Sequence, residues 1–83
     1  MIKKVILSER AKKSLRTVPK HIALKLMIWV NDVEHRGLEA ARKTPGYNDE
    51  ALKGKRRHQR SIQLNRSYRA FYVIKKMGLS LYQ

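Results

Sequence analysis

The stretch that decides the fold is ALKGKRRHQRSIQLNRSYRAFYV, residues 51–73. Its apolar Ile62 and Leu64 alternate with polar residues, which predicts a strand with one face in a core and one face in water. Residues 65–67, Asn-Arg-Ser, supply turn-forming side chains, and residues 68–74 are rich in the β-branched and aromatic residues typical of strands. The stretch therefore predicts two antiparallel strands joined by a three-residue turn.

The same stretch is strongly basic. Between Ala51 and Arg69 it holds seven cationic side chains and no carboxylate. The cations are Lys53, Lys55, Arg56, Arg57, Arg60, Arg66 and Arg69, and His58 lies among them. On two paired strands, Ser61, Gln63 and Arg69 would share one surface beside a cationic loop. This arrangement predicts a small basic concavity that binds a polyanion.

The residues before this stretch predict a strand and two helices. Residues 3–7 form a short apolar run that indicates an opening strand. Ser8 suits the N-cap of a helix over residues 8–18. A second helix should cover residues 20–36 and end at Gly37, which suits a C-cap. The two helices should form an αα-hairpin.

The apolar stripes of the helices need a flat surface to cover. On the second helix the stripe is Ile22, Leu26, Trp29, Val30 and Val33. Residues 38–43 predict a further helical turn, and residues 47–50 an acidic connection. Near the C-terminal end, Met77-Gly78 indicates a hairpin tip and residues 79–82 a last strand. We therefore expect an α+β fold in which an N-terminal strand and an αα-hairpin accompany a small antiparallel sheet of three to four strands, with the helices on one face.

Length and composition predict one domain over residues 1–83. There is no cysteine to form a disulfide framework. No apolar stretch approaches the roughly 20 residues that span a bilayer, and no signal-peptide pattern is present, so we expect a cytoplasmic protein without membrane contact. The formal net charge is +14, and all six acids lie within residues 1–50. Such one-sided charge favours a nucleic-acid partner, and the alternative is a solvated face that serves solubility.

The residue types exclude several chemistries. Acids and histidines are not clustered as a metal site requires, no Ser-His-Asp or Cys-His set is present, and glycine-rich nucleotide loops are missing. We expect no metal and no cofactor. Metal-free RNA cleavage needs a base, an acid and cations around the phosphate. His58 is the candidate base because it lies inside the basic stretch, and the alternative is a loop histidine that only forms hydrogen bonds.

Leu52 to Tyr72 contains the pattern L-x-G-x-R-x-x-x-x-S-I-x-x-N-x-x-Y-R, which resembles the central signature of the RelE/ParE toxin superfamily and more closely its HigB-like branch. The motif covers about a quarter of the chain. The resemblance implies a RelE-like fold and a type II toxin that cleaves messenger RNA in the ribosomal 30S A site. It also implies a small cognate antitoxin, which would bring acidic side chains to the basic concavity, and operator DNA bound through the complex.

The resemblance also implies roles for individual residues. Arg69 matches the Tyr-Arg arginine that holds the scissile phosphate, so Arg69→Ala should nearly abolish cleavage and leave the fold intact. Charge stabilisation is expected from Lys55, Arg57 and Arg60. Contacts to RNA are expected from Lys53, Arg56, Arg66, Ser61 and Gln63.

Two features depart from the family. RelE itself has lysines where this chain has Ser61 and Gln63. HigB-like toxins usually end in a segment with a catalytic His or Tyr, whereas this chain ends at Gln83, and Tyr82 is the nearest substitute. Two alternatives therefore stay open: a ParE-like inhibitor of DNA gyrase, and a basic module that binds nucleic acid without cleaving it.

Overall fold

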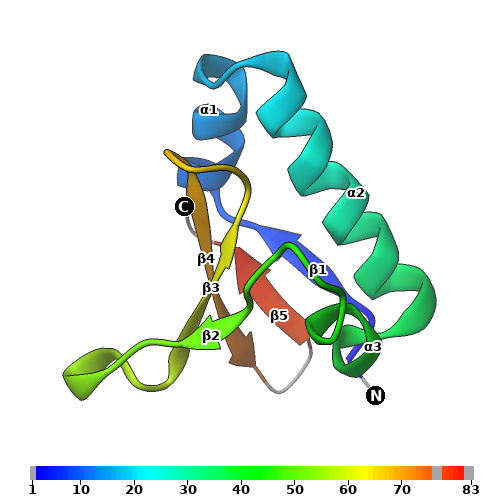
Figure 1. Ribbon diagram of the computed structural model, residues 1–83, viewed down its shortest axis with the longest axis vertical. Coiled ribbons are helices and arrows are strands. Elements are labelled where there is room, and N and C mark those ends of the chain that lie inside the picture. Colours follow the sequence, from blue (N-terminus) through cyan, green and yellow to red (C-terminus); the bar gives the residue numbers. More distant parts are fainter. Residues whose placement is uncertain (1, 76–77, 82–83) are drawn as a thin grey trace.

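The computed structural model describes residues 2–75 and 78–81. The elements are β1 Val5–Leu7, α1 Glu9–Thr17, α2 Lys20–Arg36, α3 Leu38–Arg42, β2 Glu50–Ala51, β3 Gln59–Gln63, β4 Arg69–Lys75 and β5 Gly78–Leu81, with a 3₁₀ turn at Gly54–Arg56. Helices α1 and α2 lie along one side of the sheet, and the loop between β2 and β3 extends from its opposite edge (Figure 1). The predicted α+β class, with an N-terminal strand and an αα-hairpin on a sheet, is confirmed.

The sheet differs from the prediction in strand number and direction. It has five strands in the order β1-β5-β4-β3-β2. β1 pairs with β5 in parallel, whereas the other described pairs are antiparallel. After the helices, the chain enters the sheet at the edge far from β1 and crosses it through β2, β3 and β4. It ends in β5, which lies beside β1 and runs in the same direction, so the sheet is mixed. β2, which the sequence indicated as a connection, adds a short edge strand.

The helices begin and end close to the predicted residues. The Ser8 hydroxyl accepts a hydrogen bond from the backbone N–H of Ala11 at 3.1 Å, which caps α1. Gly37 ends α2 with φ 89°, a left-handed conformation that favours glycine. The predicted extra turn after Gly37 is α3.

The core lies between the helices and the inner face of the sheet. Trp29 and Tyr72 are both fully buried, and their ring centroids are 5.2 Å apart. Ile62 and Ala70 are paired on neighbouring strands and are also buried. This face confirms the predicted alternation of apolar and polar residues in the β3–β4 hairpin.

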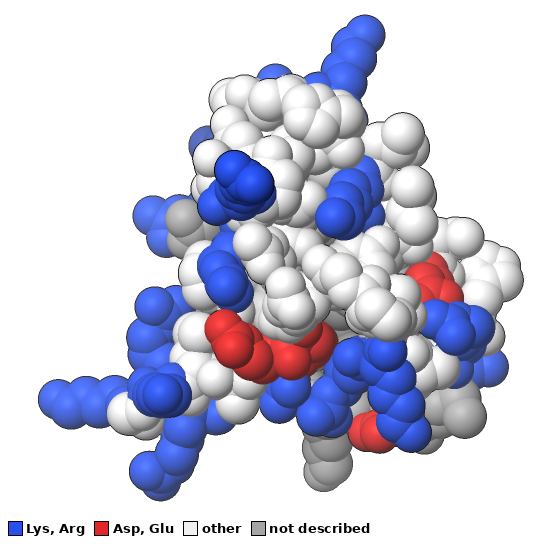
Figure 2. Space-filling model, in the orientation of Figure 1, with Lys and Arg blue, Asp and Glu red and all other residues white. Residues whose placement is uncertain are grey.

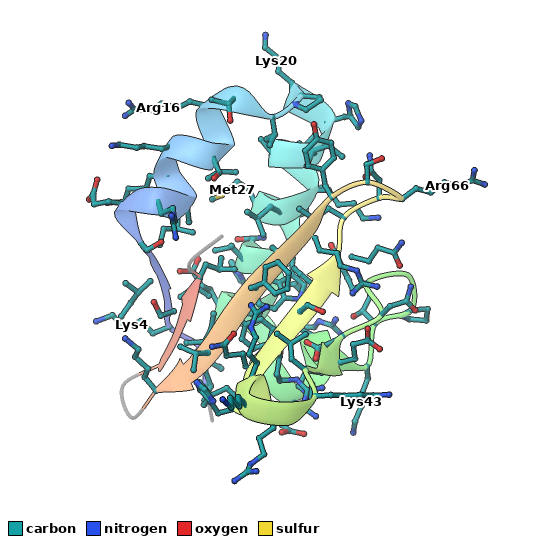
Figure 3. The ribbon with its side chains drawn as sticks, turned by 90° about the vertical axis from the view of Figure 1, so that its left-hand side faces the viewer. Lys4, Arg16, Lys20, Met27, Lys43 and Arg66 are labelled. Carbon is teal, nitrogen blue, oxygen red and sulfur yellow. The ribbon has the colours of Figure 1, made fainter. Side chains whose placement is uncertain are left out.

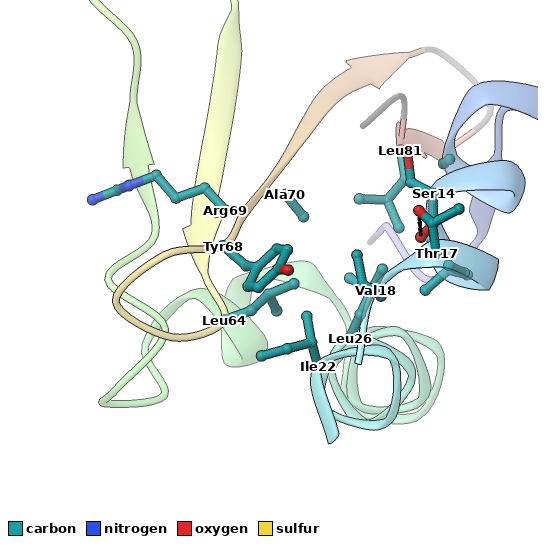
Figure 4. Close-up of a pocket in the computed structure, with 12 residues that line it drawn as sticks. Ser14, Thr17, Val18, Ile22, Leu26, Leu64, Tyr68, Arg69, Ala70 and Leu81 are labelled. Carbon is teal, nitrogen blue, oxygen red and sulfur yellow. Dashed lines mark hydrogen bonds between the residues drawn. The ribbon is translucent and has the colours of Figure 1, made fainter. Parts of the chain in front are cut away.

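The hairpin turn is the predicted one. The Asn65 side chain accepts hydrogen bonds from the backbone N–H groups of Ser67 and Tyr68, each at 2.8 Å, as is typical of an Asx turn. Beside this hairpin, an apolar cavity of about 200 Å³ lies between α1 and the start of α2 (Figure 4). Met77, in the predicted second hairpin tip, lies outside the described residues. In the described part of the chain, no helix has the length and hydropathy needed to cross a bilayer.

Candidate functional site

Arg69 lies at the centre of a polar cluster on the outer face of the sheet, away from the helices. Its Nη1 donates to the Ser61 hydroxyl at 3.0 Å and lies 3.4 Å from Oε1 of Glu50. The side chains of Arg69 and Glu50 are 41% and 61% exposed, so both are accessible to a ligand. Figure 4 shows that the guanidinium extends away from the apolar cavity whose rim Arg69 helps to form.

The sheet register explains why these side chains meet. Ser61 on β3 is opposite Glu50 on β2 and Phe71 on β4. Directly opposite residues share a face of the sheet, so these three form a row across the outer face. Gln63 and Arg69 form the next row, and Arg69 reaches diagonally to Ser61. The expectation that Ser61, Gln63 and Arg69 share one surface is confirmed.

A buried ion pair beneath the sheet fixes the orientation of β2. Asp49, whose side chain is 1% exposed, accepts hydrogen bonds from Nε of Arg60 at 2.6 Å and from the Tyr72 hydroxyl. Burial raises the pKa of Tyr72, and the Asp49 carboxylate raises it further. Burial alone would lower the pKa of Arg60, but Asp49 raises it overall. Because successive side chains of an extended segment point to opposite faces, anchoring Asp49 inward turns Glu50 outward.

The structure places Arg60 apart from Arg69. Arg60 is paired with Tyr72 on the inner face, so it lies on the side of the sheet opposite to Arg69. Its guanidinium is held by Asp49. Arg60 therefore supports the position of Glu50 and does not line the surface where the predicted phosphate contact lies.

Gln63 also has a structural role. Its side-chain oxygen accepts a hydrogen bond from the Asn48 amide at 2.7 Å, and its backbone N–H donates to the Tyr47 carbonyl at 2.6 Å. Asn48 adopts φ 47°, a left-handed conformation that asparagine tolerates. These bonds hold the segment before β2 against β3, close to Glu50.

The loop between β2 and β3 carries the predicted cations. Lys53, Lys55, Arg56, Arg57 and His58 are all exposed. Figure 2 shows Lys and Arg side chains gathered at the lower left, where Figure 1 places this loop. Arg56 folds back onto the sheet, where its Nε donates to the Gln59 side chain at 2.9 Å and its guanidinium lies 5.2 Å from the Phe71 ring centroid.

The structure does not bring His58 to Arg69. His58 adjoins Gln59, and Arg69 is paired with Gln63. Gln59 and Gln63 are four positions apart along β3, which is roughly 13 Å. His58 is therefore not placed to share one phosphate with Arg69. Arg66 projects into solvent from the turn between β3 and β4 (Figure 3).

Glu50 is the functional candidate that the sequence analysis missed. The signal was its position, because it is the last acid before the acid-free stretch. A carboxylate beside an exposed arginine is able to accept a proton from a hydroxyl group while the guanidinium grips two phosphate oxygens. In the described ranges, no group of three or more His, Cys, Asp or Glu is arranged to hold a metal ion. Tyr82 lies outside the described residues.

Comparison with known proteins relates the chain to others by its fold. No protein-family model and no curated protein match the sequence. The toxin–antitoxin complex RelBE2 from Mycobacterium tuberculosis is similar in structure, with a TM-score of 0.72 and 15% identity over 100% of this chain and 95% of that chain. The YoeB dimer from Staphylococcus aureus gives 0.71 and 14% over 98% and 92%. A mutant toxin from Helicobacter pylori gives 0.60 and 21% over 98% and 89%.

These identities are low, so the likeness concerns the fold. The predicted RelE-like fold is confirmed, whereas membership of the RelE/ParE superfamily and of its HigB-like branch stays a prediction. The chain therefore has the fold of the RelE and YoeB toxins.

Proposed function

We propose that this chain is the toxin of a type II toxin–antitoxin system and an endoribonuclease that cleaves messenger RNA in the ribosomal A site. The observation that carries this proposal is the cluster of Arg69, Ser61 and Glu50 beside a cationic loop, on a fold shared with RelE and YoeB toxins. In the described part of the chain, the Arg69 side chain donates its hydrogen bonds through Nη1. Its other guanidinium N–H groups are therefore able to bind phosphate oxygens.

The reaction that fits this cluster is attack of a ribose 2′-OH on the adjacent phosphate. Glu50 takes the 2′-OH proton as the oxygen forms a bond to phosphorus. Arg69 binds the non-bridging oxygens and stabilises their growing charge. The bond to the 5′-oxygen breaks, that oxygen takes a proton from solvent, and the products are a 2′,3′-cyclic phosphate and a 5′-OH. Glu50 replaces His58 as the proposed base because it is the proton acceptor beside Arg69.

The partner that restrains this activity is a cognate antitoxin. Its acidic side chains would bind Arg69 and the cations of the loop between β2 and β3, and so compete with RNA phosphates. The RelBE2 and YoeB–YefM structures, which are toxin–antitoxin complexes, support this partner class. Because the net charge is +14, the affinity for an acidic antitoxin should fall strongly as the salt concentration rises.

The test is messenger RNA cleavage in a translating extract, with and without ribosomes. Arg69→Ala and Glu50→Gln should each lower the cleavage rate by about 100-fold or more. Arg16→Ala is the matched control for Arg69→Ala, because it removes the same charge from an exposed position on α1, on the side of the sheet opposite to Arg69, and it should cleave normally. His58→Ala should retain most activity. A fully active Arg69→Ala protein would refute the proposal, and gyrase-dependent DNA damage without RNA cleavage would favour the ParE-like alternative.

A further inference from the structure

Phe71 is an aromatic ring on the polar outer face of the sheet. Trp29 and Tyr72 are fully buried in the core, whereas Phe71 is half-buried on the opposite side of β4. It lies directly across from Ser61, which Arg69 contacts. The Arg56 guanidinium lies over its ring, 5.2 Å from the centroid. Phe71 therefore belongs to the outer face of the sheet and not to the buried core cluster.

We propose that Phe71 and Arg56 form a nucleobase-stacking subsite next to the phosphate site at Arg69. The ligand is the base of a single-stranded RNA nucleotide adjacent to the bound phosphate. This inference rests on the proposed function, because that function is what brings RNA to this face. It assigns to Phe71 a contact that does not depend on the RNA sequence but fixes the position of the RNA strand.

The spacing along β4 supports this subsite. Arg69 and Phe71 are two residues apart, so they point to the same face with roughly 7 Å between their Cα atoms. A phosphate and its neighbouring base are separated by one sugar, so adjacent side chains on one strand face suit them. Base-aromatic stacking tolerates every base because each has a π face.

Arg56 completes the subsite from the loop. The planar guanidinium of arginine is able to stack on aromatic faces. The hydrogen bond from Arg56 to Gln59, at 2.9 Å, orients it over Phe71. At 5.2 Å from the ring centroid the guanidinium leaves no room for a base between them. The base therefore displaces the exposed Arg56 side chain from the ring, stacks on Phe71 and receives the cation–π contact of Arg56 on its other face.

The experiment measures binding without cleavage. The probe is a short single-stranded oligoribonucleotide with 2′-O-methyl sugars, which cannot attack the phosphate, and with one 2-aminopurine base, whose fluorescence falls when it stacks on an aromatic ring. The unmodified chain, Phe71→Leu and the matched Phe71→Tyr are compared in the absence of ribosomes. Their unfolding midpoints are measured in parallel, and Phe71→Trp provides a further aromatic variant.

We expect quenching with the unmodified chain, Phe71→Tyr and Phe71→Trp, and its loss with Phe71→Leu. Affinity for the probe should fall about 5- to 150-fold in Phe71→Leu. The slope of log affinity against log salt should stay unchanged, because no charge is removed. Equal quenching and affinity in Phe71→Leu and the unmodified chain would overturn the subsite, as would loss of quenching in both folded Phe71→Tyr and Phe71→Trp.

Failure of this inference and failure of the proposed function give different results. If the unmodified chain cleaves no RNA but its quenching depends on Phe71, the subsite stands and the nuclease proposal falls. If it cleaves RNA and quenching does not depend on Phe71, the nuclease proposal stands and the subsite falls.

Discussion

Replacing Arg60 by methionine tests whether the buried Asp49 carboxylate depends on its arginine. The Asp49 and Arg60 side chains are 1% and 19% exposed, and the distance from Nε to Oδ1 is 2.6 Å. Methionine keeps much of the apolar stem of arginine but removes its charge. Among the described residues, the carboxylate then keeps only the Tyr72 hydroxyl as a side-chain donor.

The expected loss is a large part of the total stability. Removing one partner of a buried ion pair costs about 3–5 kcal/mol, and we expect about 3 kcal/mol because Tyr72 still donates to Asp49. A chain of this length has a free energy of unfolding of roughly 4–12 kcal/mol, so the melting temperature should fall by roughly 12–24 °C.

Asp49→Asn is the matched control. It removes the charge that requires Arg60, and its amide oxygen still accepts the Tyr72 hydrogen bond, so we expect a loss of about 1–2 kcal/mol. The double variant Arg60→Met/Asp49→Asn should be more stable than Arg60→Met, because no unpaired charge stays buried.

The assay is urea unfolding followed by Trp29 fluorescence. Trp29 is a direct reporter because its ring packs on Tyr72 with 5.2 Å between centroids. The reasoning would be refuted if Arg60→Met were within about 1 kcal/mol of the unmodified chain, or if adding Asp49→Asn gave no recovery.

Three further predictions concern pH, backbone and salt. Burial, and secondly the Asp49 carboxylate, raise the pKa of Tyr72 in the folded state. The stability that Tyr72 contributes is therefore complete below its ordinary pKa of about 10 and is lost as the pH rises above that value. Tyr72→Phe should flatten this part of the curve of unfolding free energy against pH. Gly78→Ala would place a Cβ 2.7 Å from the Lys4 carbonyl oxygen at φ +148°, whereas a Cβ at Gly54 meets nothing within 4 Å at φ +69°. Gly78→Ala should therefore lower the melting temperature more than Gly54→Ala, and equal losses would contradict this clash. Lys55→Gln should reduce the salt slope of single-stranded RNA binding by about 0.7, and an unchanged slope would place Lys55 outside the RNA contact.

Local patterns predicted the parts of the fold that depend on neighbours in sequence. Ser8 marks the start of α1 because its side chain accepts a hydrogen bond from a free backbone N–H of the first turn. Gly37 marks the end of α2 because it adopts a positive φ. The alternation at Ile62 and Leu64 identified the inner face of β3. That alternation also places Arg60 on the inner face, since residues two apart share a face, whereas its charge alone suggests a contact with RNA.

Other features depend on distant segments and could not be predicted locally. β2 has two residues, too few for a periodic pattern. The role of Glu50 depends on pairing with β3 and on Arg69, which lies nineteen residues later. The parallel pairing of β1 with β5 joins strands from opposite ends of the chain, and the period of a strand does not indicate its partner.

The position of β5 has a consequence for the order of folding. Among the described elements, β1 is synthesised before all others and its partner in the sheet, β5, after all others, and the register joins Val5 to Leu79. The αα-hairpin contains mostly short-range contacts and is able to form early, whereas the edge of the sheet must close a loop of more than seventy residues. A nascent chain therefore keeps β1 without its sheet partner until β5 has left the ribosome, so this edge of the sheet closes later than the contacts among the preceding elements. We expect refolding to be limited by this closure.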